Sequence, residues 1–357
     1  MNGIVCFHLL NDNSGSPRVL RDILRELDRR GVRIELNTSH GGILDTLAGT
    51  AGINIRTIPY RFDAGMRLPR FTWAQIRMFF AGMRHAWHNN VFYINTLLPV
   101  GAAIAGRLTG HRVVYHCHEN AREKGWHYRL LQWCMCRLAS DIICVSQSQR
   151  DGIPRKRRMH VVPNFLSNEF LTGLLPFDPQ RAFACRRVLM LSSLRRYKGV
   201  PQFLRLAESL PDIAFELVLN ESPQALSNVL RNVQLPSNVI VHSRQKDITP
   251  FYNRASLLLN LSDPAMISET FGLTALEAMG AGLPAIVPPT GGIAEIVTDG
   301  VNGYHVDVND FDRLRDTVAA LLDDYQRYAR LAQAAHDRAA DFSAHNSVDT
   351  IRHILLG

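Results

Sequence analysis

Residues 268–284 read SETFGLTALEAMGAGLP, and this stretch decides the fold of the chain. Glu269 and Gly272 fall in a predicted loop, and the apolar run after them predicts a short helix that carries Glu277 and ends near Gly280. A helix start presents unpaired N–H groups and partial positive charge, so it suits an anion such as a phosphate. At about 1.5 Å rise per residue the two carboxylates can lie roughly 10 Å apart, which matches a nucleoside diphosphate-sugar.

This segment resembles the E-x7-E signature of the retaining glycosyltransferases of family 4, which have the GT-B fold. The resemblance extends past the two acids through the predicted strand at 284–287, the diglycine and helix at 291–297 and the N-G corner at 299–303. Two glutamates at this spacing would carry little weight alone, whereas the whole run is specific. The alternative is an ordinary αβ unit with solvated glutamates.

The length and composition of the chain predict a globular protein of two domains. It has 357 residues, 46% of them apolar and 20% charged, which is too long for one typical core. No run of about 18 apolar residues occurs, so no transmembrane helix is expected. The first eight residues lack a basic leader and predict a strand rather than a signal peptide. Six scattered cysteines predict reduced thiols in a cytoplasmic protein.

The charge of the chain is unevenly distributed. Residues 1–168 hold 23 Lys and Arg against 11 Asp and Glu, whereas the rest hold 17 against 21. A basic half indicates an anionic partner, either a membrane surface or a lipid-diphosphate acceptor. Nucleic acid is not expected, because no helix-turn-helix, zinc finger or RNP-like run occurs.

Alternating strand and helix signals predict an α/β fold with parallel sheets. Strands are expected at 4–10, 32–37, 92–95, 113–115 and 141–145, and again at 188–193, 214–219, 239–242, 257–261 and 284–287. The resemblance implies two Rossmann-like domains facing each other across a deep cleft. We place the N-terminal acceptor domain at 1–168, a linker at 167–185 and the C-terminal donor domain at 186–342. A terminal helix at 343–357 is expected to pack back on the first domain.

The segment 193–199 follows a predicted strand and resembles the family motif that holds the donor diphosphate. In that motif an arginine is followed five residues later by a lysine. Lys198 matches the lysine, but Ser193 stands where the family has its arginine, so Arg195 or Arg196 would supply that charge. Fixed cations stabilise the charge that develops on a leaving diphosphate. A solvated loop lysine is the alternative.

The resemblance also assigns roles around the E-x7-E segment. Glu269 would bind the donor sugar or steady positive charge at its reacting carbon, and Glu277 would hold the ribose. Backbone N–H groups would bind the phosphates or the sugar at Phe271, Gly272, Leu273 and Thr274. No metal or other cofactor is expected, because basic residues and helix dipoles take the place of a metal in this family.

Two sites are predicted in the first domain. Gly15 and Ser16 form a small-residue turn before a helix, where the backbone can approach an anion closely, or simply turn. Ser16 is predicted to cap that helix. His118 follows a strand and matches the family histidine near donor sugar and acceptor, although a core histidine is the alternative. His116 shares its strand face and Cys117 does not, so a zinc site lacks a ligand set.

The region 67–88 interleaves arginines with aromatic residues. Its members are Arg67, Arg70, Trp73, Arg77, Phe79, Phe80, Arg84 and Trp87. This composition predicts peripheral contact with an anionic membrane or a lipid acceptor, and the equal alternative is a crossover helix with one buried face.

Together these features predict a catalytic function. We expect a metal-independent, retaining transfer of a hexose-type sugar from a nucleotide-diphosphate sugar to a hydroxyl of a lipid-linked or cell-surface polysaccharide precursor. The enzyme would be cytoplasmic, peripheral at the inner face of the membrane. A nucleotide-sugar epimerase or hydrolase on the same fold, and a non-catalytic nucleotide-sugar-binding protein, are the alternatives.

Overall fold

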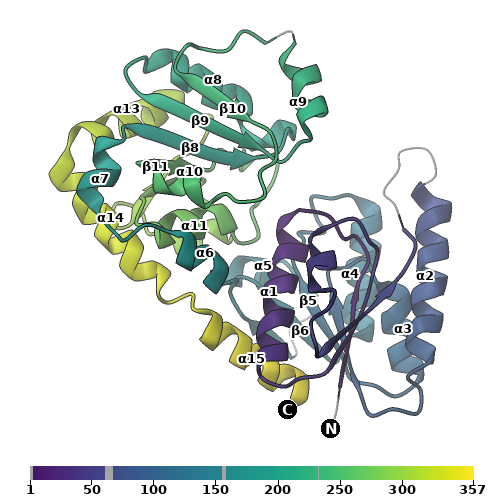
Figure 1. Cartoon of the computed structure of the whole chain (residues 1–357). Helices are drawn as coiled ribbons and strands as arrows, with labels where there is room; N and C mark the ends of the chain where they lie inside the picture. Colours follow the sequence, from purple (N-terminus) through teal and green to yellow (C-terminus); the bar gives the residue numbers. More distant parts are fainter. Residues whose placement is uncertain (1–2, 61–66, 155–157, 232) are drawn as a thin grey trace. The chain divides into compact units, whose positions relative to one another are not determined.

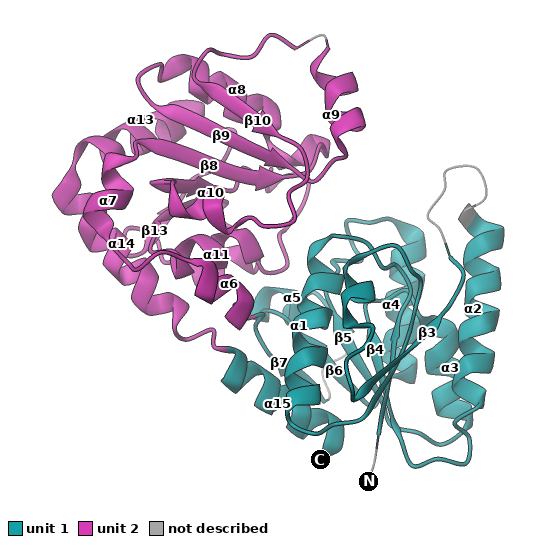
Figure 2. Ribbon diagram, in the orientation of Figure 1, with its two compact units in different colours: residues 1–164, 344–357 teal, residues 165–343 magenta. Residues whose placement is uncertain are grey.

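The structure is a computed structural model that describes residues 3–60, 67–154, 158–231 and 233–357, without the side chain of Arg67. Contacts divide the chain into two compact units (Figure 2). Unit 1 comprises residues 1–164 and 344–357, and unit 2 comprises residues 165–343. Each unit is built around one parallel sheet with helices on both faces (Figure 1). This is the α/β architecture of two Rossmann-like domains.

The sheet of unit 1 has the order β3-β2-β1-β4-β5-β6-β7, and every pairing is parallel. Its strands are β1 (Ile4–His8), β2 (Ile34–Thr38), β3 (Ile53–Thr57), β4 (Val91–Asn95), β5 (Val113–Cys117), β6 (Asp141–Cys144) and β7 (Met159–Val161). Four of these strands are buried along their whole length, because helices cover both faces. The strand order reverses between β1 and β4, which are neighbours in the sheet.

Within its described residues, unit 1 has six α-helices. They are α1 (Gly15–Arg29), α2 (Arg67–Met83), α3 (Val100–Leu108), α4 (Trp126–Leu138), α5 (Gln147–Asp151) and α15 (Ala344–Leu356), with a short 3₁₀ turn η1 (Ile43–Leu47). One apolar cluster joins α2, α3 and α4 to the same face of the sheet. α1 and α15 contact each other on the opposite face. In the described part of the chain, no helix has the length and apolar character needed to cross a membrane.

The last helix, α15, is an integral part of unit 1 although unit 2 precedes it in the chain. Ile351 and Leu355 are buried in it. Arg112 donates to the carbonyl of Ile354 at 2.6 Å, and the hydroxyl of Ser347 donates to the carbonyl of Pro163 at 3.0 Å. These contacts attach the end of the chain to unit 1.

The sheet of unit 2 has the order β10-β9-β8-β11-β12-β13 and reverses between β8 and β11. Its strands are β8 (Arg187–Ser192), β9 (Ala214–Leu219), β10 (Val239–His242), β11 (Leu257–Leu259), β12 (Ala285–Val287) and β13 (Gly303–His305). Its helices are α6 (Asn168–Gly173), α7 (Pro179–Ala184), η2 (Arg196–Lys198), α8 (Val200–Ser209), α9 (Pro223–Leu230), α10 (Thr249–Asn253), α11 (Leu273–Gly280), α12 (Ile293–Ile296), α13 (Phe311–Asp323) and α14 (Tyr325–Ala339). All pairings are again parallel.

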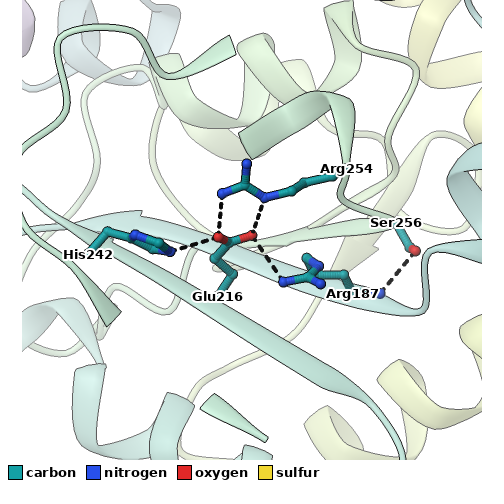
Figure 3. Close-up of polar contacts among 5 residues, drawn as sticks. All are labelled: Arg187, Glu216, His242, Arg254 and Ser256. Atoms are coloured by element: carbon teal, nitrogen blue, oxygen red, sulfur yellow. Dashed lines mark hydrogen bonds and ion pairs between the residues drawn. The ribbon is translucent and has the colours of Figure 1, made fainter. Parts of the chain in front are cut away.

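A buried carboxylate ties three strands of unit 2 together (Figure 3). Glu216 on β9 accepts from Arg254 at 3.0 Å, from His242 at the end of β10 at 2.8 Å and from Arg187 on β8 at 3.4 Å. Burial alone would raise the pKa of Glu216, but the two arginines and the histidine outweigh burial and lower it. The cluster anchors the end of β10 and the start of the loop that follows it.

The structure differs locally from what was expected. The segment 167–185, expected as the linker, holds two short helices, because Ser167 and Asp178 each cap a helix by accepting a backbone N–H. The cap of α1 is Ser14, not Ser16, since helical backbone already begins at Gly15. β3 was not predicted at all, because this edge strand is half exposed and lacks the apolar run of a central strand.

Truncating Ile351 to alanine tests whether α15 is needed for the stability of unit 1. The side chain is buried, so Ile351→Ala should lower the unfolding free energy by about 2–5 kcal/mol. His353→Ala on the exposed side of the same helix should change it by about 0.5 kcal/mol or less. Urea unfolding monitored by tryptophan fluorescence gives both values, since all four tryptophans lie in unit 1. Equal effects would show that α15 is only loosely attached.

Candidate functional site

The chemistry-bearing residues lie at the two points where strand order reverses. In unit 1 these are the carboxyl ends of β1 and β4, and in unit 2 those of β8 and β11. Parallel α/β sheets bind ligands in the crevice outside the strand ends at such a reversal, because the helices diverge there. Lys198 follows β8 and Glu269 follows β11, so both lie at the reversal of unit 2.

Backbone contacts hold the loop of Lys198 against the loop after β11. Gly199 has φ of 72°, and a Cβ there would come within 2.3 Å of the carbonyl oxygen of Leu261. Only glycine therefore permits this close approach. The N–H of Asp263 donates to the carbonyl of Tyr197 at 2.8 Å. The two loops are thus joined on both sides of Lys198.

Lys198 and Glu269 form an ion pair in this setting. The ammonium group donates to Oε1 of Glu269 and, at 3.5 Å, to the hydroxyl of Ser262, which itself donates to Glu269. The side chains are mostly buried, at 23% and 17% exposure. Burial alone would raise the pKa of Glu269, but Lys198, Ser262 and Asn260 outweigh burial and lower the pKa. Glu269 is therefore held as a carboxylate.

The diglycine of the sequence motif positions Glu269 through its backbone. Gly292 donates its N–H to the carbonyl of Glu269 at 2.7 Å. Gly291 has φ of 89°, and a Cβ there would lie 2.6 Å from the same carbonyl oxygen. Gly272, the residue before α11, has φ of 92° and packs against Ile293 with no room for a Cβ. The E-x7-E segment and the diglycine therefore pack together as one structural unit.

The start of α11 presents backbone rather than side chains. Phe271 is buried, with its ring edge-on to Phe342 at 6.0 Å. Leu273 and Thr274 are half-buried and begin the helix. As in any helix, the first N–H groups have no intrahelical partner. Gly272 comes immediately before these N–H groups, and because it has no side chain it leaves the start of the helix unobstructed.

Glu277 lies further along α11, inside unit 2. It is 2% exposed, and its Oε2 accepts from the hydroxyl of Tyr252 on α10 at 2.6 Å. Tyr252 also donates to the carbonyl of Thr274 at 3.4 Å. Tyr252 therefore braces both Glu277 and the first turn of the helix.

Arg195 and Arg196 extend from the same loop into solvent. Both side chains are exposed, and within the described residues neither pairs with an acid. Ser193 is half-buried at the end of β8. The structure thus brings two uncompensated cations to the Lys198 loop, and which of them contacts a phosphate stays a prediction.

In unit 1 a hydrogen-bonded chain links His8, Asn95 and His118 across the ends of β1, β4 and β5. His8 Nε2 lies 2.8 Å from the carbonyl of Leu10, which can only accept, so His8 Nδ1 is the acceptor for the Asn95 amide at 2.9 Å. Asn95 Oδ1 then accepts from His118 Nε2 at 2.9 Å. One carbonyl therefore determines the tautomer of both histidines.

Burial keeps this chain neutral. Desolvation lowers the pKa of His8 to about 4. It also places the pKa of His118 well below its usual range, with His116 and His8 acting in the same direction. His116 stacks on His118 at 4.3 Å between ring centres and contacts the hydroxyl of Tyr93 at 2.7 Å. His118 is thus presented as a neutral, oriented imidazole.

The loop around His118 is held by further polar contacts. Glu119 is buried and accepts from the N–H groups of Leu97 and His118 at 3.3 Å. Thr96, next to Asn95, has φ of 72°, which is a strained backbone conformation for a β-branched residue. Across the described residues, no cluster of three His, Cys, Asp or Glu side chains suits a metal ion.

Gly15 begins α1 and Ser16 follows it. No atom lies within 4 Å of where a Cβ of Gly15 would stand, and its φ lies outside the left-handed region. Packing therefore does not require glycine here. Ser14 forms hydrogen bonds to Asp12 through its hydroxyl, at 2.5 Å, and its N–H, at 2.8 Å, which holds the turn.

A hollow of about 1190 Å³ lies at the other edge of the unit 1 sheet, beside the starts of β1, β2 and β3. Arg33, Arg84 and Arg352 are exposed along it. It has the volume of a ligand pocket, but it is at the amino ends of the strands, away from His118. We therefore place the chemistry at the strand reversals rather than in this hollow.

Comparison with known proteins identifies the class. Residues 185–338 match the family described as Glycosyl transferases group 1, and residues 13–170 match Glycosyltransferase Family 4. The chain therefore belongs to the family 4 glycosyltransferases, and its two Rossmann-like domains are those of the GT-B fold. The predicted family and fold class are confirmed.

Particular relatives differ in their named reactions. A D-inositol 3-phosphate glycosyltransferase of Xylanimonas cellulosilytica is 29% identical over 52% of this chain and 48% of the relative. An N-acetyl-alpha-D-glucosaminyl L-malate synthase of Bacillus anthracis is 26% identical over 42% and 39%. The chain thus spans about half or less of the length of these curated relatives.

Solved structures share the fold across the whole chain. Anabaena Alr3699/HepE, in complex with UDP and glucose, aligns with a TM-score of 0.81 at 20% identity, covering 100% of both chains. Sucrose-phosphate synthase from Thermosynechococcus elongatus aligns with a TM-score of 0.81 at 16% identity, covering 99% and 98%. At such identities the likeness concerns the fold.

Several residues of the site were not predicted from the sequence. They are His8, Asn95, Tyr252, Asn260 and Ser262. Each is a common polar residue at or near a strand end or on a short helix. The only sequence feature that could have indicated a site role was its position after an apolar run. The partners that join them to the site, such as Glu277 for Tyr252 and Asn95 for His8, lie 25 and 87 positions away, and local patterns do not reveal such contacts.

Replacing His8 tests the neutral hydrogen-bonded chain. In the folded protein the pKa of His8 is about 4, so the side chain stays neutral until the pH falls that low. In the unfolded chain its pKa is 6.5, so it is protonated below that pH. The contribution of His8 to stability is therefore fully present above pH 6.5 and falls by up to about 3 kcal/mol as the pH drops to 4. His8→Gln should flatten the dependence of unfolding free energy on pH between 6.5 and 4.5.

Exposed His353 provides the matched control as His353→Gln, because its side chain lies outside the buried chain of His8, Asn95 and His118. Urea unfolding at several pH values gives the slopes for wild type and both variants. Identical slopes for wild type and His8→Gln would contradict the assigned neutral state.

Proposed function

We propose that this protein is a retaining glycosyltransferase that moves a hexose-type sugar from a nucleotide-diphosphate sugar to a hydroxyl acceptor. The observation that carries the proposal is the Lys198–Glu269 pair beside the start of α11, at the strand reversal of unit 2. Membership of a glycosyltransferase family supports the reaction class. The relative Alr3699/HepE, whose structure holds UDP and glucose, supports a nucleotide-sugar donor.

The arrangement of cations favours a diphosphate at this position. Lys198 has three N–H donors, of which Glu269 and Ser262 take two, so one remains for a phosphate oxygen. Arg195 and Arg196 add positive charge, and the first N–H groups of α11 add a helix dipole. These groups are set before the reaction, so they stabilise the charge that develops as the nucleoside diphosphate leaves. The proposed site needs no metal.

Glu269 would act on the donor sugar as a carboxylate. Its lowered pKa keeps it charged, so it can bind sugar hydroxyls or stabilise positive charge at the reacting carbon. The Glu269 carboxylate contacts Lys198 and Ser262. We therefore propose same-face attack assisted by the leaving phosphate rather than a covalent mechanism, which would need two carboxyls about 5 Å apart.

For the acceptor we propose a lipid-linked or cell-surface polysaccharide precursor. The support is the basic excess in residues 1–168, which favours an anionic partner. His118 is proposed to contact the donor sugar, and its fixed tautomer suits a specific hydrogen bond. Gly15 and Ser16 are proposed to let the backbone approach an anionic group. The protein would then work at the cytoplasmic face of a membrane as a peripheral enzyme.

Nucleotide screening tests the donor. Thermal shift with UDP, GDP and ADP and their sugars should stabilise the protein with one base family, and NMR of the product should show an unchanged anomeric configuration. Release of free sugar at the full rate without acceptor would indicate a hydrolase instead, and inversion at the anomeric carbon would contradict the mechanism.

Glu269→Gln should mostly reduce turnover. The loss of a fixed charge beside the reacting carbon should lower kcat by about 100-fold or more with little change in the donor KM. Exposed Asp212 in the same unit is the matched control, and Asp212→Asn should behave as wild type. An unchanged kcat for Glu269→Gln would remove Glu269 from the mechanism.

Glu277→Gln should instead weaken nucleotide binding by about tenfold or more, because a charge-assisted hydrogen bond to the ribose is lost. Tyr252→Phe is the companion variant, since it removes only the internal partner of Glu277. Isothermal calorimetry with the preferred nucleoside diphosphate measures both. If the two variants lower thermal stability alike and neither changes the Kd, Glu277 is a structural residue only.

A further inference from the structure

Three neighbouring helices of unit 1 have no acidic residue. α2, α3 and α4 contain no Asp or Glu, and none occurs anywhere between residues 64 and 118. α3 contacts both α2 and α4, and all three pack on one face of the sheet. Five exposed arginines lie on or directly after these helices, at Arg77, Arg84, Arg107, Arg129 and Arg137. The outer face of this layer therefore carries one sign of charge.

The same three helices are apolar on two sides. α2 buries Ala74, Met78 and Ala81 against the sheet. On its outer side, residues at spacings of three, four and seven form a second stripe of Trp73, Ile76, Arg77 and Phe80, all exposed. α4 repeats this with exposed Trp126, Leu130, Trp133 and Arg137, and α3 adds exposed Ile104 and Leu108. Folding needs only the inner stripe.

Three of the four tryptophans lie on α2 and α4, and the fourth, Trp87, follows α2 in the chain. The protein has four, and all are exposed, Trp73 by 55%, Trp87 by 96%, Trp126 by 70% and Trp133 by 56%. Folded domains usually bury tryptophan, so four exposed ones need an explanation. Arg77 stacks over Trp73, and Arg137 over Trp133, both at 5.3 Å. Such amphipathic rings beside cations are typical of the water–lipid boundary.

We propose that the outer face of α2, α3 and α4 docks on an anionic lipid bilayer, with tryptophan, phenylalanine and leucine side chains entering the headgroup boundary and arginines binding lipid phosphates. This inference assigns a specific surface to the membrane contact named in the proposed function. The biological purpose of the contact rests on that proposed function. The exposed apolar side chains supply partition into the boundary, and the arginines supply attraction to negative lipids.

Charge decides between a bilayer and a second copy of the chain. A symmetric dimer through this face would place arginines opposite arginines, with no acid on the three helices to compensate them. A nucleic acid would pair with the arginines but would leave the aliphatic side chains Leu68, Ile76, Ile104 and Leu108 exposed. An anionic bilayer would pair with the arginines and would also bury the exposed apolar side chains.

Vesicle co-sedimentation of the full chain, without donor, tests the proposal. Wild type should bind vesicles of phosphatidylcholine with about 30% phosphatidylglycerol at low ionic strength, bind pure phosphatidylcholine far less, and lose most binding at about 0.5 M salt. Brominated lipids should quench its tryptophan fluorescence. Absence of binding to anionic vesicles at low salt, or equal binding to neutral ones, would overturn the proposal.

Two pairs of substitutions separate charge from apolar contact. Arg77→Glu with Arg137→Glu should lower the partition coefficient by about tenfold or more. Trp73→Ser with Trp133→Ser should lower it and reduce quenching. The controls lie in unit 2, where Arg313→Glu with Arg330→Glu changes exposed arginines, and Val229→Ser with Ile240→Ser removes exposed apolar side chains. The controls should bind as wild type does.

Further measurements distinguish the remaining outcomes. Circular dichroism and the thermal shift with nucleotide should match wild type for every variant, because none lies at the strand reversals. If sedimentation velocity shows a dimer that Trp73→Ser with Trp133→Ser dissociates, a second copy occupies the face and the proposal is wrong. Vesicle binding by a protein that fails to transfer sugar would leave this inference standing and reject the proposed function alone.

Discussion

The ion pair between Lys198 and Glu269 is the interaction on which the site of unit 2 depends. It joins the loop after β8 to the loop after β11, the two strands at which the sheet reverses. A carboxylate this buried would be protonated more readily without its lysine, and the pair is stable because Ser262 and Asn260 also bond to it. Glycines at 199, 272 and 291 let the surrounding backbones approach closely enough to form it.

Unit 1 has the same architecture as unit 2 but carries different groups at its strand ends and on its helices. At the carboxyl edge of its sheet, His8, Asn95 and His118 form a neutral chain whose direction is imposed by one backbone carbonyl. On its helical face, charge and apolar surface are left exposed together. The neutral histidine chain offers directional hydrogen bonds without charge. The exposed arginines and apolar side chains of the helical face offer attraction that does not depend on a precise orientation of the partner. The two arrangements lie in different parts of unit 1, one at the strand ends and the other on the outer helices.

The elements of the fold were largely predictable because buried parallel strands are continuous apolar runs. β9 and β10 fall at the expected residues, and the E-x7-E helix begins where its glycine places it. The half-exposed edge strand β3 and the capped helices of the segment 167–185 were not predicted. In those elements a cap, or pairing with a neighbouring strand, decides the structure rather than periodicity.

Local spacing along the chain was enough to predict the family, the alternation of strand and helix, and the presence of Glu269, Lys198 and His118 at strand ends. Which groups meet depends on the folded structure. It paired Glu269 with Lys198, turned Glu277 toward Tyr252, set the tautomer of His118 and gathered the exposed tryptophans of α2 and α4 on one side of a sheet. These outcomes depend on hydrogen bonds and packing between segments far apart in the chain, and no local pattern encodes such distances.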